Sequence, residues 1–189
     1  ELKTMVVLLD ARSTTILVPV IAGIGKTALA AKLVEMFTHK RNLLYHRVQD
    51  WEGARAFLEV ASEWLSAIGD DGLSDYLATT PVPSAPMSVN LIVGGLANTS
   101  ALLVIDDLHK LNDEVLFSVI RGLSERMEEM DDVGIVLFSR SFRPVMPLTD
   151  SEGNIMTLVV HLEGLDREAS RELLTALPDM DEVTYMHIY

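Results

Sequence analysis

The feature that most constrains this fold is a series of short apolar segments separated by stretches with helical spacing. Their β-branched and apolar composition predicts buried strands at residues 14–18, 43–48, 101–105, 133–138 and 156–162. Helical patterns are expected over residues 2–12, 27–39, 51–68, 87–98, 112–130 and 166–177, while residues 69–86 and 140–154 are the most loop-like. Asp50 is expected to cap the helix over residues 51–68, and Asn112 or Asp113 is expected to start the helix that ends near residue 130. Strands that alternate with helices predict an α/β fold, with a mainly parallel sheet between two layers of helices.

The first strand is followed by a glycine-rich turn that opens a helix, reading Val20-Ile21-Ala22-Gly23-Ile24-Gly25-Lys26-Thr27. Ligands of such sheets bind outside the carboxyl ends of the strands, and glycines let backbone N–H groups converge on a phosphate there. Lys26 is suited to the β- and γ-phosphates of a nucleotide and Thr27 to Mg²⁺. The predicted phosphate-binding residues are Ala22, Gly23, Ile24, Gly25, Lys26, Thr27 and Ala28.

This turn departs from the GxxxxGK[ST] pattern at its first position, where Val20 replaces glycine. The half that faces the phosphate, from Gly23 to Thr27, is intact. The alternative reading of the same residues is a simple glycine turn with a surface lysine.

The third strand ends in two carboxylates, Asp106 and Asp107. Adjacent carboxylates at the end of a buried strand repel each other unless they meet a cation or water. We therefore expect Asp106 to hold Mg²⁺ and Asp107 to polarise a water molecule that attacks the γ-phosphate. The alternative left open is a solvated pair that caps the following turn.

The fourth strand ends in Ser139 and Arg140, which would emerge on the same side of the sheet as the glycine-rich turn. Arg140 is the candidate for contacting the γ-phosphate and reporting its loss, and Arg143 is a second choice. His109 could approach the nucleotide, although a surface histidine at a helix start is the more common case. For both arginines, the alternative is a surface ion pair with one of the many acids.

Composition excludes several functions. The chain has no cysteine, which rules out disulfides and thiol nucleophiles, and its histidines lack the spacing of metal ligands. With 15 Lys and Arg against 28 Asp and Glu, the net charge is −13, which speaks against broad binding to nucleic acid or anionic membranes. No apolar run of about 18 residues and no signal-peptide pattern is found, so a cytoplasmic protein is expected.

Four segments of this chain resemble the nucleotide-binding domain of STAND NTPases, signal-transduction ATPases related to AAA+ proteins, with the archaeal ATPase branch most similar. The resemblance covers residues 14–177 and is carried by residues 23–30, 102–107, 138–141 and 162–169. It implies a three-layer α/β/α P-loop NTPase with a five-stranded sheet of order 5-1-4-3-2 and ATP as the preferred nucleotide. It further implies a nucleotide-binding domain over residues 1–165. Residues 166–189 would form the start of a helical subdomain, which we expect to be truncated because the later motifs of the family are absent.

We therefore expect a module that binds ATP or ADP with Mg²⁺ and hydrolyses ATP slowly as a regulatory switch. Lys26, Asp107 and Arg140 would carry the catalysis, and Thr27 and Asp106 would bind the metal. Family members signal through oligomerisation, so protein partners or self-association are expected, without direct nucleic-acid binding. The alternatives are a nonhydrolysing nucleotide-binding scaffold, an AAA+ DNA-associated loader, which the acidic charge counts against, and a small-molecule kinase, which lacks an arginine-rich lid.

Overall fold

Five parallel strands form the centre of the protein. The computed structural model describes residues 1–19, 25–140 and 157–162. Within these ranges the strands are β1 (Thr14–Pro19), β2 (Asn42–Arg47), β3 (Ala101–Asp106), β4 (Val133–Ser139) and β5 (Thr157–Val159). All neighbouring pairs run parallel, in the order β2-β3-β4-β1-β5. Both the α/β class and the strand order 5-1-4-3-2, read from the opposite edge, are confirmed.

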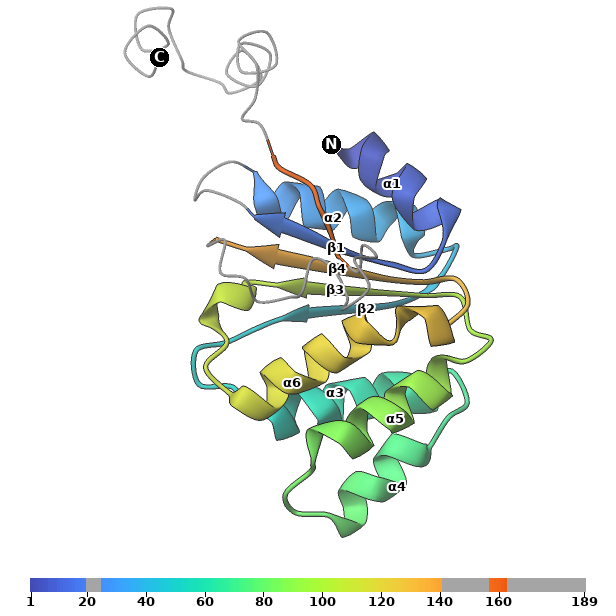
Figure 1. The fold of residues 1–189 in the computed structure, drawn as a ribbon, viewed down its shortest axis with the longest axis vertical. Helices are drawn as coiled ribbons and strands as arrows, with labels where there is room; N and C mark the ends of the chain where they lie inside the picture. Colours follow the sequence, from blue (N-terminus) through green and yellow to red (C-terminus); the bar gives the residue numbers. More distant parts are fainter. Residues whose placement is uncertain (20–24, 141–156, 163–189) are drawn as a thin grey trace, which may run out of the picture.

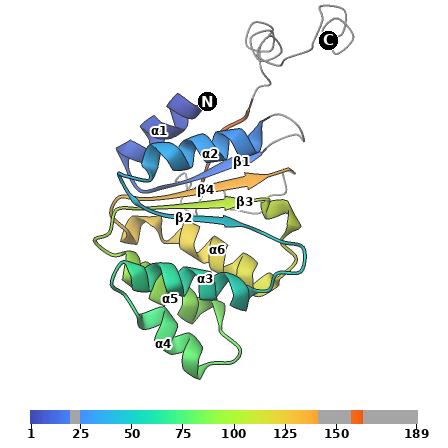
Figure 2. The same ribbon diagram turned by 180° about the vertical axis from the view of Figure 1, so that it is seen from behind.

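Helices cover both faces of this sheet (Figures 1 and 2). One face carries α1 (Leu2–Ala11) and α2 (Lys26–Phe37), and the other carries α3 (Ala54–Ala67) and α6 (Glu114–Glu125). Two more helices, α4 (Gly72–Thr79) and α5 (Ala85–Leu96), form an outer layer against α3 and α6. The short turns η1 (Leu108–Lys110) and η2 (Met127–Glu129) flank α6. Among the described helices, none is long and apolar enough to span a bilayer.

The pleat of the strands separates two apolar cores. On β3, Leu102 and Val104 pack into the core under α1 and α2, whereas Leu103 and Ile105 pack into the core under α3 and α6. Successive side chains of a strand point to opposite faces, so Asp106 shares the face of Leu102 and Val104. The last residue of β3 therefore faces α2, the helix that the glycine-rich turn opens.

The prediction of a loop over residues 69–86 was wrong, because α4 lies inside this segment. Leu73 and Leu77 are spaced by four residues and both are buried, which gives a short helix an apolar side. The helix ends before Pro81, the first of the three prolines that made the segment look irregular.

Asp113 determines where two helices begin. One carboxylate oxygen accepts the N–H of Leu116 at 2.8 Å, which confirms Asp113 as the cap of α6. Its other oxygen accepts the N–H of Ala54 at 3.2 Å. The second long helix, α3, accordingly starts at Ala54, so the prediction that Asp50 caps it was wrong.

Several expectations lie outside the described residues. They include residues 20–24 of the glycine-rich turn, Arg143 and the rest of the expected loop, the helix over 166–177 and the boundary at residue 165.

We predict that two glycine-to-alanine changes have opposite effects on stability. In Gly122→Ala, on α6, the new methyl would lie 2.9 Å from Cγ2 of buried Val89. Overpacking of this kind lowers the free energy of unfolding by about 1–3 kcal/mol, which outweighs the gain in helix propensity. In Gly94→Ala, on α5, the methyl meets no atom within 4 Å, and the gain of up to about 1 kcal/mol remains. Urea unfolding of both variants measures this difference, and a stabilised Gly122→Ala would show that the α5–α6 contact is looser than described.

Candidate functional site

The centre of the candidate site is an ion pair between the start of α2 and the end of β3. The ammonium of Lys26 lies 2.7 Å from Oδ1 of Asp106 and also contacts Oδ1 of Asp107. Both carboxylates are buried, with about 1% of each side chain exposed. The structure therefore brings the predicted phosphate-binding lysine and the two predicted acids together, although they are about 80 positions apart in the sequence.

Asp106 is held through both of its carboxylate oxygens. Oδ1 accepts the backbone N–H of Asp107 at 2.6 Å in addition to its contact with Lys26. Oδ2 accepts the hydroxyl of Tyr45, on the neighbouring strand β2, at 3.2 Å. Burial, together with the negative charge of Asp106 and the hydrogen bond to it, raises the pKa of Tyr45 to about 12.

Asp107 adopts a backbone conformation rare for aspartate and is surrounded by cations. Its φ is +56°, which turns the chain out of β3 into η1. Besides Lys26, its carboxylate accepts Nε–H of Arg47 at 2.9 Å and lies 3.3 Å from the ammonium of Lys110. Burial would raise the pKa of Asp107, but hydrogen bonds from Lys26 and Arg47 outweigh burial and hold the pKa well below its usual range.

These residues make a locally basic spot in an acidic chain. Three cations, Lys26, Arg47 and Lys110, surround two carboxylates, so this cluster carries a net charge of +1 within a chain of −13. A small cationic cluster at the carboxyl edge of a parallel sheet attracts a compact anion such as a phosphate.

The donor set fits Mg²⁺ bound together with phosphates. The described residues contain no group of three or more His, Cys, Asp or Glu side chains that could cage a metal alone. Mg²⁺ prefers one or two protein oxygens and takes its other ligands from phosphate and water. Asp106 and the hydroxyl of Thr27, next to Lys26 in the first turn of α2, are the residues that would hold it.

The other predicted site residues have different outcomes. Gly25 precedes α2 with φ +92°, a conformation that favours glycine, and Thr27 and Ala28 are exposed in the first turn. Ala22, Gly23 and Ile24 lie outside the described residues. Arg140 reaches the same edge of the sheet and is exposed, where its backbone N–H donates to Nδ1 of His109 at 3.4 Å. Burial lowers the pKa of His109, although the charge of Asp107 opposes this.

The sequence reasoning missed the partners of the two acids, which are Tyr45, Arg47 and Lys110. Tyr45 and Arg47 lie two residues apart on β2, and Arg47 pairs in register with Asp106. The signal that could have found them was present, because the expected strand order places β2 beside β3. Polar residues at the end of a neighbouring strand then reach the same edge.

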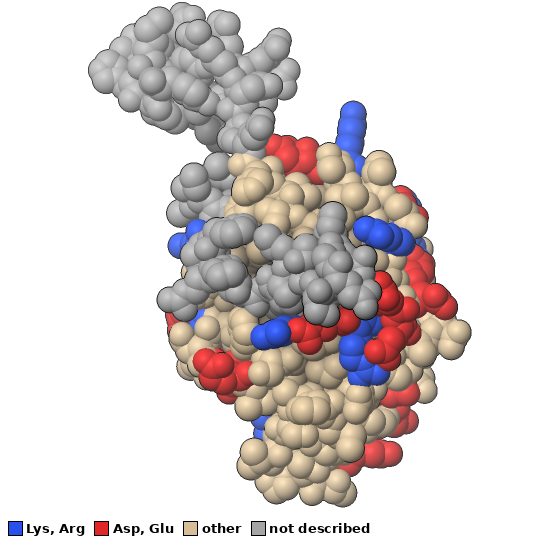
Figure 3. Space-filling model, viewed as in Figure 1, with Lys and Arg blue, Asp and Glu red and all other residues tan. Residues whose placement is uncertain are grey.

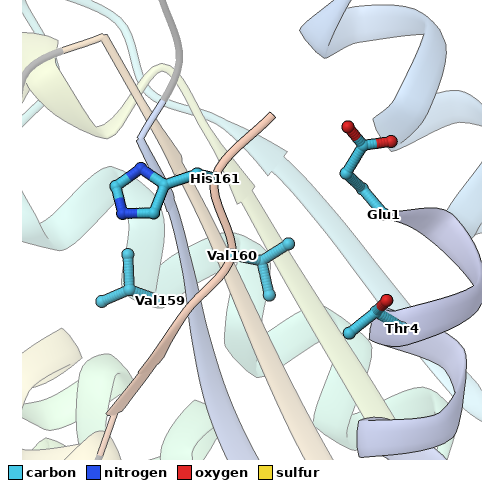
Figure 4. Close-up of a pocket in the computed structure, with 5 residues that line it drawn as sticks. All are labelled: Glu1, Thr4, Val159, Val160 and His161. Atoms are coloured by element: carbon cyan, nitrogen blue, oxygen red, sulfur yellow. The ribbon is translucent and has the colours of Figure 1, made fainter. Parts of the chain in front are cut away.

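The surface and a pocket elsewhere on the protein add little to this site. On the face seen in Figure 3, basic and acidic side chains are interspersed among the described residues, and the surface over α4 and α5 is mostly uncharged. A pocket of about 500 Å³ lies between the first turn of α1 and the end of β5 (Figure 4). It is lined by Glu1, Thr4, Val159, Val160 and His161, and none of the predicted site residues lies in it.

Comparison with solved structures identifies the fold. The chain is similar to AMPPCP-bound DnaA from Aquifex aeolicus, with a TM-score of 0.51 and 15% identity, over 97% of this chain and 53% of that one. A DNA replication initiation factor matches with a TM-score of 0.50 and 15% identity, over 93% and 47%. The Aeropyrum pernix ORC1 protein, solved in complex with DNA, matches with a TM-score of 0.48 and 18% identity, over 86% and 43%. No protein-family model and no curated protein matches.

The chain spans about half the length of the solved chains that it matches. Its all-parallel sheet has the strand order of the AAA+ P-loop core. The protein is thus an α/β module with the fold of the AAA+ P-loop core, similar in structure to AMPPCP-bound DnaA over most of its length.

We predict that Tyr45 stays neutral at a pH where an ordinary tyrosine ionises. Because its phenol lies beside the buried carboxylate of Asp106, only about 10% of a group with a pKa of about 12 is ionised at pH 11, against about 90% for an ordinary phenol. Ultraviolet spectra of the native protein and of Tyr45→Phe should therefore show nearly the same phenolate absorbance at pH 11. In guanidinium chloride the variant should lose one of the four tyrosine signals. If Tyr45→Phe instead loses one phenolate signal in the native state at pH 11, Tyr45 ionises like an ordinary tyrosine, which would contradict its hydrogen bond to Asp106.

Proposed function

We propose that this module binds ATP together with Mg²⁺, hydrolyses ATP slowly and uses the bound nucleotide as a regulatory switch. The observation that carries the proposal is the contact of Lys26 with Asp106 and Asp107. It joins the helix start that would bind phosphates to the acids that would hold the metal and polarise water. The structural similarity to AMPPCP-bound DnaA supports the nucleotide class, while ADP would be the product that remains in the site.

Each residue has a separate task in this proposal. Backbone N–H groups at the start of α2, with the ammonium of Lys26, bind the phosphates in place of the two carboxylates. When Lys26 turns to the phosphates, Asp107 loses one of the three cations that depress its pKa and becomes a better proton acceptor for the attacking water. Arg140, exposed at the end of β4, would contact the γ-phosphate. Thr27 and Asp106 would hold Mg²⁺, which would neutralise part of the phosphate charge.

A switch also needs something that reads its state. We propose that a protein partner or a second copy of the chain does so in the cytoplasm, as in the STAND proteins that the sequence resembles. The interspersed charges of Figure 3 and the net charge of −13 favour a protein partner over nucleic acid.

A nonhydrolysing nucleotide-binding scaffold is the second candidate, and the environment of Asp107 favours it. A carboxylate that contacts Lys26, Arg47 and Lys110 is a weak base. If Arg47 and Lys110 keep their contacts after the nucleotide binds, the protein would bind ATP without turnover.

We predict that Lys26→Ala weakens Mg-ATP binding by at least about 100-fold, because the variant loses the ammonium that meets the phosphates. The fold should be retained, since Asp107 keeps Arg47 and Lys110 and Asp106 keeps Tyr45. Isothermal titration measures the affinity and circular dichroism the fold. Lys32→Ala is the matched control, because Lys32 lies on the same helix and its ion pair within the described part of the chain is with exposed Glu35. Equal affinity of Lys26→Ala and the unmodified chain would remove the nucleotide assignment.

We predict that Asp107→Asn separates the two candidates. A switch that hydrolyses ATP should lose phosphate release by about 100-fold or more, the usual contribution of a general base. Its Mg-ATP affinity should be kept or increased, because the cations around position 107 then lack their carboxylate. Phosphate release and isothermal titration give the two numbers. Unmodified protein without phosphate release would support the scaffold, whereas a variant that keeps the release of the unmodified protein would overturn the role of Asp107 as the general base.

A further inference from the structure

We propose that Tyr45 is a positioning residue for Asp106, and that its hydroxyl sets how tightly the nucleotide site takes up Mg²⁺. This inference rests on the proposed function, in which Asp106 is a metal ligand. Tyr45 itself would touch neither the metal nor the nucleotide and would act through the carboxylate.

The register of the sheet places the hydroxyl beside the acid. Tyr45 pairs with Val104 across β2 and β3, and Asp106 lies two residues further along the same face. Diagonal neighbours at this spacing are within reach of a long aromatic side chain. The hydroxyl accordingly donates to Oδ2 of Asp106 at 3.2 Å.

Within the described part of the chain, the contacts of Asp106 leave one of its lone-pair positions for a further ligand. A carboxylate offers about four lone-pair positions, two on each oxygen. On Oδ1, Lys26 and the N–H of Asp107 occupy both positions. On Oδ2, Tyr45 occupies one. A cation would meet this remaining position on Oδ2, or the position on Oδ1 that Lys26 leaves when it turns to the phosphates, and Tyr45 fixes the orientation of the carboxylate.

The hydroxyl matters most after the nucleotide binds. In the proposed mechanism Lys26 moves to the phosphates, which leaves Asp106 with the N–H of its neighbour and the hydroxyl of Tyr45. Of the side chains that contact Asp106 in the described residues, Tyr45 is then the one that still holds it. Hydrogen bonds to a ligating carboxylate orient it, and their loss typically weakens metal binding by about 10–100-fold.

Removal of this hydroxyl should have little effect on the fold. Tyr45 is 40% exposed on an edge strand, so Tyr45→Phe keeps the ring and deletes a single polar atom at the surface of the site. Tyr76→Phe is the matched control, because Tyr76 lies on α4, where its hydroxyl accepts the N–H of Ser84 at the start of α5, away from the two acids.

The test measures ADP binding to the full chain by isothermal titration, at a series of Mg²⁺ concentrations and in EDTA. For Tyr45→Phe we expect half-maximal enhancement of binding at about 10-fold more Mg²⁺, with unchanged affinity in EDTA and an unchanged melting temperature. Tyr76→Phe should need the same Mg²⁺ as the unmodified chain.

Two results would overturn the inference alone while the proposed function stands. One is a Tyr45→Phe variant that needs the same Mg²⁺ or less, and the other is an equal loss of ADP affinity with and without Mg²⁺. An unmodified chain that binds neither ADP nor Mg-ADP would instead overturn the proposed function, and the inference with it.

Discussion

The contact of one ammonium with two adjacent buried carboxylates is the interaction on which this site depends. Asp106 and Asp107 are consecutive and almost fully buried, an arrangement that is costly unless cations compensate it. Lys26 contacts both acids, and Arg47 and Lys110 complete the compensation at Asp107. The cations come from α2, β2 and η1, so three separate parts of the chain must fold correctly before the acids can be buried.

The topology of the sheet explains how these parts meet. β1 and β2 are separated by β4 and β3, so the connection through α2 crosses the sheet and packs over β3. Lys26, at the start of that helix, therefore reaches the end of β3 rather than the strand that it follows in sequence. A parallel sheet brings all carboxyl ends to one edge, and the crossover selects which of them lies under the helix.

Much of the fold and the centre of the site could be predicted from the sequence. Apolar runs predicted the strands, the STAND resemblance implied their order, and the acids after Ile105 were predicted as a Mg²⁺ ligand and a water-polarising base at the edge of the sheet that also carries Lys26. Two features were not predicted, and each has a physical reason. The helix α4 is stabilised by packing of Leu73 and Leu77 against neighbouring helices. The local sequence, with its glycines and prolines, indicates only turns. The contacts of Tyr45 and Arg47 depend on the register between two strands that lie more than 50 residues apart.

That register has a consequence for how the protein could lose or change its chemistry. β2 is an edge strand, held on one side only by β3 among the described residues. A slip of this strand by a single residue would turn Tyr45 and Arg47 to the opposite face and bring His46 into their place. The acids would then face an imidazole in place of a phenol and a guanidinium, so a purely geometric shift at the border of the sheet would change the balance of charge around Asp106 and Asp107.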